Sequence, residues 1–336
     1  MSLMKAAVLN GLNLPLEIVD IKIPELKPNE ALVKLKAAAL NHRDVWIQKG
    51  QYAGIVNPII LGSDGCGVVE KTGSKEFEYW LNKEVIINPS LNWGNNPRVQ
   101  AKDYVILGTP HNGTFAQYVK ISVELLHEKP NHLSFEQAAA FPLAGLTAYR
   151  ALFGRAKALQ GETVLITGIG GGVALFAAQF AIAAGCKVYV TSSSIDKIDK
   201  AISIGAIGGA IYTQPEWHKQ LSKETGGFDV IIDGAGGDNF AKLVDLAKPA
   251  ARIAMYGATA GGFNSGVPAK IFWKQLDILG STMGNNEEFN EMVKFINQHQ
   301  IVPVVSHSFN LAQANEAMLL MDKGGQFGKI VLNIPQ

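Results

Sequence analysis

A glycine-rich turn between a short apolar strand and an apolar helix is the first feature of the chain that could do chemistry. Residues 162–167 (ETVLIT) lead into residues 168–174 (GIGGGVA), and residues 175–185 (LFAAQFAIAAG) continue as a helix. Unpaired N–H groups and the helix dipole attract an anion to such a helix start, and missing Cβ atoms let a pyrophosphate approach the backbone. We therefore predict a dinucleotide site that includes Gly170, Gly171, Gly172 and Val173. The alternative is a glycine-rich turn without a ligand.

The literal dinucleotide fingerprint is imperfect in this turn. If Ala174 takes the third, helix-packing position, Gly171 takes the second, and Ile169 stands where the first glycine is expected. The flanking strand and helix therefore carry the prediction more than the glycine pattern does.

Three serines and a lysine after the second strand indicate which dinucleotide binds. Residues 187–191 (KVYVT) end in Ser192, Ser193 and Ser194, with Lys197 a turn later. An NAD site usually has Asp or Glu here to hold the ribose 2′-hydroxyl. Hydroxyls and an ammonium instead suit a 2′-phosphate, so we predict NADP(H), held by Ser192, Ser193 and Lys197. The alternative is that the serines cap the helix at residues 195–202.

Charge and cysteine content exclude several classes of protein. Lys plus Arg number 30 and Asp plus Glu 29, so the chain has no broad positive field for nucleic acid or an anionic membrane. The two cysteines, Cys66 and Cys186, can build neither a disulfide framework nor a cysteine-rich zinc lobe. The longest apolar run, residues 173–184, is shorter than the roughly 20 residues of a membrane helix. We expect a cytoplasmic protein, because no signal sequence opens the chain. With nucleic acid and membranes excluded, the expected partner is a small-molecule substrate.

The pattern of apolar runs changes along the chain. Up to about residue 120 it consists of short β-type runs between turn-rich segments, with an Asn- and Gly-rich stretch at residues 89–110 that predicts a lobe or lid. Further on, helices alternate with short β-branched runs, which is typical of a parallel, doubly wound sheet. The fold class is therefore α/β, and the final run, residues 329–334, is expected to rejoin the first domain.

A family resemblance covers nearly the whole chain. The segments that carry it are LNHRDVWIQKGQY, ILGSDGCGVV, NGTFAQYV, FPLAGLTAYRAL, TGIGGGVALFAAQ, FDVIIDGAGG, ARIAMYGAT, DILGSTMG and FGKIVL. In this order they resemble the medium-chain dehydrogenases/reductases, in particular the quinone oxidoreductase and zinc-type alcohol dehydrogenase-like branch. The resemblance implies a GroES-like, mostly β catalytic domain at 1–124 and 286–336, a Rossmann domain at 125–285, a cleft between them, and a homodimer.

The zinc ligands of that family are missing from this sequence. At the positions that match the three catalytic ligands stand Asn41, Ser63 and Leu143, and residues 89–110 lack the four cysteines of the structural zinc. An amide, a hydroxyl and an alkyl chain cannot replace thiolate and imidazole around Zn²⁺. We therefore expect neither metal.

The resemblance also suggests which residues meet substrate and cofactor. Asn41 is the first candidate donor to the substrate oxygen, because an amide donates without any pKa adjustment. Tyr52 either donates a proton or simply lines the pocket as a half-buried aromatic. Asp44 is expected to brace the backbone. His42 and Arg43 are expected near the pyrophosphate or at the solvated surface. By resemblance, the remaining cofactor contacts are Thr147 beside the nicotinamide, and Tyr212, Gly257 and Ala258.

Loss of the metal decides which reaction is expected. Without a Lewis acid, oxidation of a simple alcohol becomes difficult, whereas a conjugated acceptor forms an enolate or a phenolate that hydrogen-bond donors can stabilise. We predict hydride transfer from NADPH to a quinone or an α,β-unsaturated carbonyl compound. The alternatives are a zinc-type alcohol dehydrogenase with other metal ligands, and an NADPH-binding sensor or structural protein without turnover.

Overall fold

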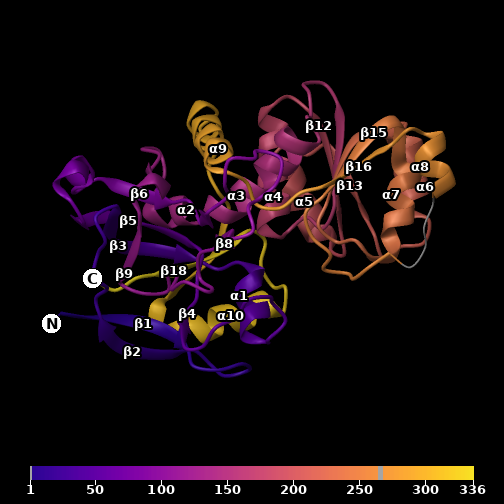
Figure 1. The fold of residues 1–336 in the computed structure, drawn as a ribbon. Helices are drawn as coiled ribbons and strands as arrows, with labels where there is room; N and C mark the ends of the chain where they lie inside the picture. The colour runs from indigo at the N-terminus through magenta and orange to yellow at the C-terminus, as the bar shows by residue number, and fades with distance from the viewer. Residues whose placement is uncertain (1, 264–267) are drawn as a thin grey trace. The chain divides into compact units, whose positions relative to one another are not determined.

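The computed structural model describes residues 2–263 and 268–336, and the chain divides into two compact units. Unit 1 consists of Met1–Ala144 and Gly284–Gln336, and unit 2 of Gly145–Met283. The first division therefore falls later than the predicted residue 124, because the helix at Phe135–Ala139 packs on strands of unit 1. The two termini both lie in unit 1, and the yellow C-terminal segment runs among its indigo strands (Figure 1).

Unit 1 is built on a mixed, mostly antiparallel sheet of seven strands in the order β10-β6-β5-β3-β18-β17, with β9 also paired to β3. A three-stranded sheet, β2-β1-β4, and a small hairpin, β7-β8, complete it. The strands are β1 Leu3–Leu9, β2 Glu17–Lys22, β3 Glu30–Ala39, β4 Ile59–Ile60, β5 Asp64–Thr72, β6 Glu84–Ile87, β7 Ser90–Leu91, β8 Val105–Ile106, β9 Tyr118–Ser122, β10 Leu126–Glu128, β17 Val305–Asn310 and β18 Lys329–Asn333. As predicted, the last strand rejoins this domain, because β18 pairs antiparallel with β3.

An apolar core packs the sheets of unit 1 against the helices α1 and α10. That core contains Leu35, Ile47, Leu61, Phe115 and Leu332, all fully buried. The helices are α1 His42–Gln48, α2 Phe135–Ala139, α9 Asn286–Gln298 and α10 Ala314–Asp322, while α3 Pro142–Tyr149 begins in unit 1 and ends in unit 2. Short β7 and β8 within residues 89–110 show that the predicted lobe has its own hairpin.

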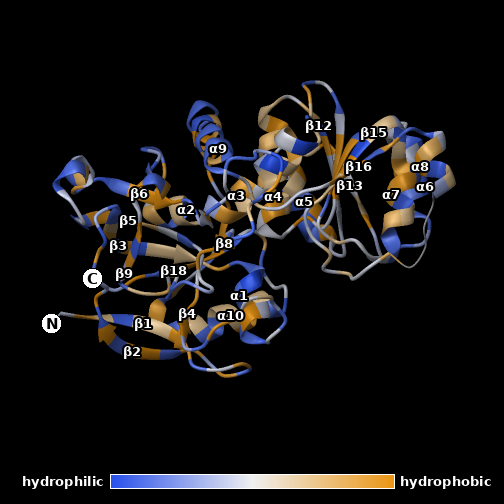
Figure 2. Cartoon of the chain, viewed as in Figure 1, coloured by the Kyte–Doolittle hydropathy of each residue, from blue (hydrophilic) through white to orange (hydrophobic). Residues whose placement is uncertain are grey.

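Unit 2 is a parallel, doubly wound sheet, as its alternating runs predict. The strand order is β13-β12-β11-β14-β15-β16, and every neighbouring pair is parallel. The strands are β11 Thr163–Ile166, β12 Lys187–Ser192, β13 Gly208–Ile211, β14 Phe228–Asp233, β15 Ala247–Met255 and β16 Asp277–Gly280. The helices are α4 Gly172–Ala183, α5 Ile195–Ser203, α6 Trp217–Thr225, α7 Phe240–Leu246 and α8 Pro268–Trp273. The strands are mainly apolar and the helices carry both polar and apolar residues (Figure 2).

The strand order reverses between β11 and β14, the two central strands. Loops that leave the carboxyl ends of such a pair diverge and leave a crevice where open α/β sheets bind their ligands. The glycine-rich turn leaves β11 at this point, so the topology places the predicted dinucleotide site where the fold class expects one.

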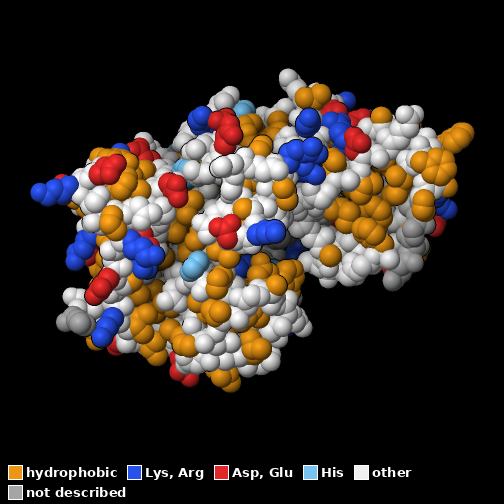
Figure 3. Space-filling view, viewed as in Figure 1, with side chains coloured by type: hydrophobic (Ala, Val, Ile, Leu, Met, Phe, Trp, Pro, Cys, Tyr) orange, Lys and Arg blue, Asp and Glu red, His pale blue; other side chains and the backbone are white. Residues whose placement is uncertain are grey.

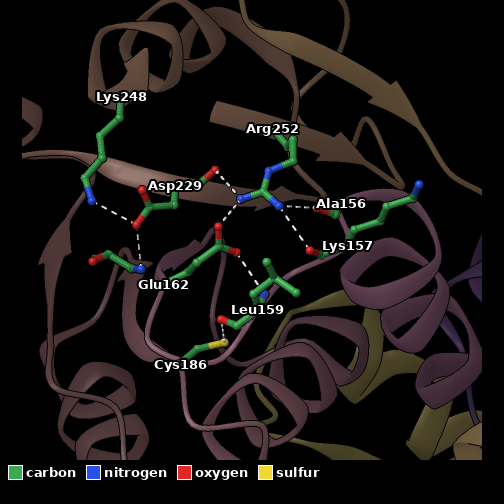
Figure 4. Close-up of polar contacts among 9 residues, drawn as sticks. Ala156, Lys157, Leu159, Glu162, Cys186, Asp229, Lys248 and Arg252 are labelled. Carbon is green, nitrogen blue, oxygen red and sulfur yellow. Dashed lines mark hydrogen bonds and ion pairs between the residues drawn. The ribbon is translucent and has the colours of Figure 1, made fainter. Parts of the chain in front are cut away.

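A polar network ties the opposite, amino-terminal edge of this sheet (Figure 4). The Arg252 guanidinium donates to the carbonyl oxygens of Ala156 and Lys157, both at 3.0 Å, and pairs with the Glu162 carboxylate. Asp229 accepts from the backbone N–H of Thr163 at 2.8 Å and from Lys248 at 2.8 Å. These bonds fix the loop that enters β11.

We expect Arg252→Met to lower the free energy of unfolding by about 2 kcal/mol, because it leaves one carboxylate and two carbonyl groups without their donor in a partly screened position. Urea unfolding measures this loss. The exposed pair between Lys294 and Glu291 on α9 provides the control, and Lys294→Met should change stability by less than about 0.5 kcal/mol. Equal losses in both variants would contradict a structural role for the network.

Candidate active site

The glycine-rich turn leaves an open space in front of the first turn of α4. Gly168 and Gly170 have positive φ angles, +65° and +124°, which favour glycine. Gly171 is the N-cap of α4, and a Cβ added at Gly168 or Gly171 would meet no protein atom within 4 Å. The first turn of α4 begins there, and its leading N–H groups, such as those of Gly172 and Val173, have no carbonyl partner within the helix. This space and these donors fit the pyrophosphate of a dinucleotide.

Two residues of the turn, Ile169 and Ala174, have buried side chains. Ile169 donates its backbone N–H to the Thr191 carbonyl at 2.8 Å, and its side chain is buried. Ala174, predicted at the helix-packing position, is also buried. Ile169 therefore belongs to the apolar core beneath the turn, and a glycine is not required at its position.

Lys197 lies against this turn. A Cβ built on Gly170 would be 3.2 Å from the Lys197 Nζ, so the ammonium sits beside the backbone of the turn. Burial, with a smaller contribution from the nearby Lys200, lowers the pKa of Lys197 below its usual value. A half-buried ammonium beside a predicted phosphate site is suited to bind an anion.

The three serines take different positions. Ser192 is buried, and its Oγ accepts from the backbone N–H of Ser194 at 3.2 Å. Ser193 is exposed, and Ser194 is the N-cap of α5 but makes no side-chain capping bond. Ser192 therefore serves the local backbone, whereas the exposed Ser193 lies at the surface and the Ser194 side chain does not cap α5.

A buried Thr–Asp pair at the reversal of strand order escaped the sequence reasoning. Thr167 follows β11 and donates to Asp233 Oδ1 at 2.6 Å, at the end of β14. The same carboxylate accepts from the N–H groups of Ala235 at 3.1 Å and Gly236 at 3.0 Å. It thus fixes both loops that border the crevice. The sequence does contain a signal for this pair, because an aspartate ends the apolar run FDVIID at residues 228–233.

The other predicted cofactor residues belong to unit 2 and differ in exposure. Tyr212 is half-buried after β13 and donates its N–H to the Ser192 carbonyl at 3.0 Å. Gly257 passes so close to Gly234 that an added Cβ would be 2.8 Å from the Gly234 carbonyl oxygen, and Ala258 is exposed. Thr147 is buried on α3, with its hydroxyl 3.6 Å from the sulfur of Met283.

In unit 1, a buried ammonium closes a triangle with Asn41 and Asp64. Lys329 is 3% exposed, and its Nζ is 2.6 Å from Asn41 Oδ1 and 3.0 Å from Asp64 Oδ2. Asn41 Nδ2 donates to the same Asp64 oxygen at 2.9 Å. Asp64 Oδ1 accepts from the backbone N–H of Leu143 at 2.8 Å. One carboxylate therefore joins the residues at the first and third predicted ligand positions to a lysine from the end of the chain.

A second network occupies the remaining ligand position. The Ser63 hydroxyl donates to the Leu107 carbonyl at 2.7 Å and accepts from Arg43 Nη1 at 2.7 Å. Arg43 is buried, and its guanidinium lies 4.8 Å from the centre of the half-buried Tyr52 ring. Tyr52 and Arg43 thus form one group beside Ser63.

These donors do not fit a zinc ion. The Asn41 oxygen is engaged by an ammonium, the Ser63 oxygen is engaged by Arg43 and Leu107, and Leu143 offers no ligating side-chain atom. Within residues 2–263 and 268–336, no group of three or more His, Cys, Asp or Glu could hold a metal. A Zn²⁺ ion beside the buried Lys329 would also meet an unscreened like charge.

Asp44 is a buried carboxyl at the start of α1. Its Oδ2 accepts from the backbone N–H of Asn41 at 2.8 Å, so it braces the residue that carries the amide, while Oδ1 has no partner among the described residues. Burial raises the pKa of Asp44 to about 6, although Arg43 and the Asn41 bond act in the opposite direction.

This shift makes stability depend on pH. Between the unfolded value near 4 and the folded value of about 6, the folded protein binds more protons than the unfolded chain, so stability falls as the pH rises through that range. We expect Asp44→Asn to remove this loss, with a stability difference from wild type that grows by on the order of 2 kcal/mol from about pH 4 to about pH 7. Urea unfolding at both pH values measures it. A difference that stays constant would refute the shift.

Comparisons with known proteins match both units. Residues 27–131 match the alcohol dehydrogenase GroES-like domain, and residues 172–298 match the zinc-binding dehydrogenase family. A zinc-type alcohol dehydrogenase-like protein of Leptosphaeria maculans is 36% identical, with 95% of both chains covered.

More distant relatives carry other activities in their names. A crotonyl-CoA reductase of Streptomyces avermitilis is 28% identical, over 93% of this chain and 80% of its own. A quinone oxidoreductase of Pongo abelii is also 28% identical, over 93% of this chain and 92% of its own. A crystal structure of an NAD-dependent alcohol dehydrogenase superposes with a TM-score of 0.91 at 36% identity, over 99% of this chain and all of the other. The chain is therefore a nicotinamide-dependent oxidoreductase of the medium-chain dehydrogenase/reductase superfamily.

Proposed function

We propose that this protein reduces a quinone or an α,β-unsaturated carbonyl compound with NADPH and without a metal. The observation that carries the proposal is the buried Lys329 ammonium, which is bonded to Asp64 and to Asn41, the residue that the resemblance matches to the first zinc ligand of the zinc-dependent type. The positive charge beside Asn41 is therefore the Lys329 side chain, whose ammonium is already bonded to Asn41 and Asp64. The acceptor must therefore be one that takes a hydride without a Lewis acid.

The chain's own groups suit such a reaction. NADPH, when bound, supplies the hydride. Addition of hydride to the β carbon of an enone moves the electron pair onto the carbonyl oxygen, and a proton then completes the reduction. The second N–H of Asn41 Nδ2, which is not used by Asp64, can donate to that oxygen as charge develops. Tyr52 is a phenol that can supply the proton or bound the acceptor.

Two relatives support this acceptor class. The names of the crotonyl-CoA reductase and the quinone oxidoreductase describe a conjugated thioester and a quinone as acceptors. The alcohol dehydrogenase names of other relatives favour a second candidate, the interconversion of an alcohol and a simple carbonyl compound. The donor set around Lys329 argues against the second candidate, because it offers no Lewis acid for an unactivated carbonyl group.

An NADPH oxidation assay with quinones, enones, saturated aldehydes and ketones separates the two candidates. We expect turnover with conjugated acceptors and little with saturated ones. Faster turnover of saturated carbonyl compounds would favour the alcohol dehydrogenase. Tight NADPH binding without oxidation by any acceptor would indicate a cofactor-binding sensor.

The preference for NADPH has its own test at Lys197. We expect Lys197→Ala to weaken NADPH binding by on the order of 1 to 3 kcal/mol with little change for NADH, because the ammonium meets the 2′-phosphate. Fluorescence titration of both cofactors measures it. Lys200→Ala, on the exposed side of the same helix, is the control and should bind as wild type does. Equal losses for NADPH and NADH would place Lys197 at the pyrophosphate instead.

We further propose a cytoplasmic homodimer that binds neither nucleic acid nor membranes. Hydrophobic side chains gather on the visible face of unit 2 (Figure 3), and Phe272 and Trp273 on α8 are 68% and 83% exposed, as expected of residues that a second copy covers. Among the described residues, no helix is both long enough and apolar enough to span a bilayer.

A further inference from the structure

The side-chain amide of Asn41 is held from both ends by charged groups. Its oxygen accepts from the Lys329 ammonium at 2.6 Å, and its nitrogen donates to the Asp64 carboxylate at 2.9 Å. Lys329 and Asp64 are themselves paired at 3.0 Å, and all three side chains are buried. Lys329 is 288 residues from Asn41 and 265 residues from Asp64 in the sequence, so only the fold brings the three side chains together.

This triangle admits only one orientation of the amide. If the amide rotated by half a turn, its NH₂ group would face an ammonium and its oxygen would face a carboxylate. Both contacts would then be repulsive in a place where water cannot screen them. Lys329 and Asp64 therefore determine which way the Asn41 donor points.

The orientation leaves one N–H without a partner. Nδ2 carries two hydrogens and Asp64 takes one, while Asn41 makes no second donor contact with any other described residue. The ammonium at the far end of the amide withdraws electron density through the conjugated N–C–O group, so the remaining N–H becomes a stronger donor. A neutral amide thereby gains some of the electrostatic strength that a metal would supply.

We propose that Lys329 is a positioning residue, which acts through Asn41 to aim and strengthen the N–H that receives the developing oxyanion of the acceptor. The inference rests on the proposed reduction of a conjugated acceptor. It assigns Lys329 no contact with the acceptor and no proton transfer. Its effect is to be seen in kcat, because the hydrogen bond strengthens as charge develops on the oxygen.

The test must separate this role from simple stabilisation of the fold. Lys329→Met alone would leave Asp64 buried without its counter-ion and would destabilise the protein. The double variant Asp64→Asn/Lys329→Met removes both charges, keeps a side-chain oxygen for the Leu143 N–H, and restores balance. Because the double variant removes both charges that orient Asn41, it tests the pair: if the Asp64–Lys329 pair were only structural, activity would recover together with stability.

We expect the double variant to unfold near the wild-type urea midpoint and to keep wild-type KM and NADPH affinity, with kcat for an enone lowered about 30-fold. Lys329→Arg, which keeps a cation at the amide oxygen, should retain more kcat than the double variant. The matched control Glu291→Gln/Lys294→Met removes an exposed ion pair and should leave kcat unchanged. A folded double variant with kcat within about 2-fold of wild type would overturn the proposal.

The wild-type protein provides a second test, in which a variant serves only to identify the resonances. In ¹⁵N-labelled protein, Asn41→Ala identifies the side-chain amide resonances of Asn41. Addition of a phenolate, which mimics the reduced acceptor, should move one Nδ2 proton resonance of that amide and leave the proton bonded to Asp64 in place. Movement of neither proton, or of both equally, would overturn the proposal. If wild type reduces no conjugated acceptor, the proposed function fails; if it does and these tests fail, only the role of Lys329 is refuted.

Discussion

Replacement of Gly171 with Val is expected to raise the Kd for NADPH about 10³-fold, or about 4 kcal/mol, without loss of the fold. Gly171 has φ −75° and ψ 153°, which Val adopts freely, and a Cβ there would meet no protein atom within 4 Å. The added side chain would instead fill the space in front of α4 that the pyrophosphate requires. The variant should therefore lose NADPH affinity and remain folded.

Fluorescence titration with NADPH and urea unfolding together measure this effect. Ala183→Val is the control, because it adds bulk at the other end of the same helix, and it should bind NADPH as wild type does. Retention of NADPH affinity in a folded Gly171→Val protein would show that the open space does not hold the pyrophosphate.

Removal of the Asn41 amide is expected to lower kcat for an enone or quinone by 10²- to 10³-fold, about 3 to 4 kcal/mol, the usual effect of losing one oxyanion donor. Asn41→Ala deletes the N–H that is free to meet the acceptor oxygen. KM should change little, since the hydrogen bond gains most of its strength after hydride transfer has begun. Steady-state kinetics with saturating NADPH measure both constants.

Asn315→Ala is a matched control for this loss. Asn315 accepts from the backbone N–H of Leu16 at 2.8 Å and donates to the Leu16 carbonyl at 2.9 Å, so its amide ties α10 to a loop. Its removal should lower stability and leave kcat unchanged. If both variants lose activity in proportion to stability, Asn41 has a structural role only.

The nucleotide-binding unit could be predicted from the sequence because its signals are local. The central strands β11 and β14 contain continuous apolar runs, and the glycine turn stands between a strand and a helix, as at Gly171. The comparisons and the strand order confirm the predicted fold class. The NADP preference and the individual contacts stay predictions.

The polar centre of unit 1 was harder to predict because its bonds join distant segments. Asn41 and Ser63 were identified from motifs, but no local pattern marks Lys329, which reaches Asn41 only after β18 pairs with β3. In the sequence this lysine is one cation at the start of an apolar strand. Likewise, Thr167 and Asp233 meet only because parallel β11 and β14 end side by side.

The central claim is that a conjugated acceptor is reduced without a metal, and zinc content measured together with activity tests it most directly. The purified protein is dialysed against a chelator, its zinc is counted by elemental analysis, and NADPH oxidation is followed with an enone or a quinone. The account predicts unchanged turnover at less than about 0.1 zinc per chain, because Lys329 and its partners leave no metal ligands. About one zinc per chain, with activity lost to the chelator and restored by Zn²⁺, would contradict it.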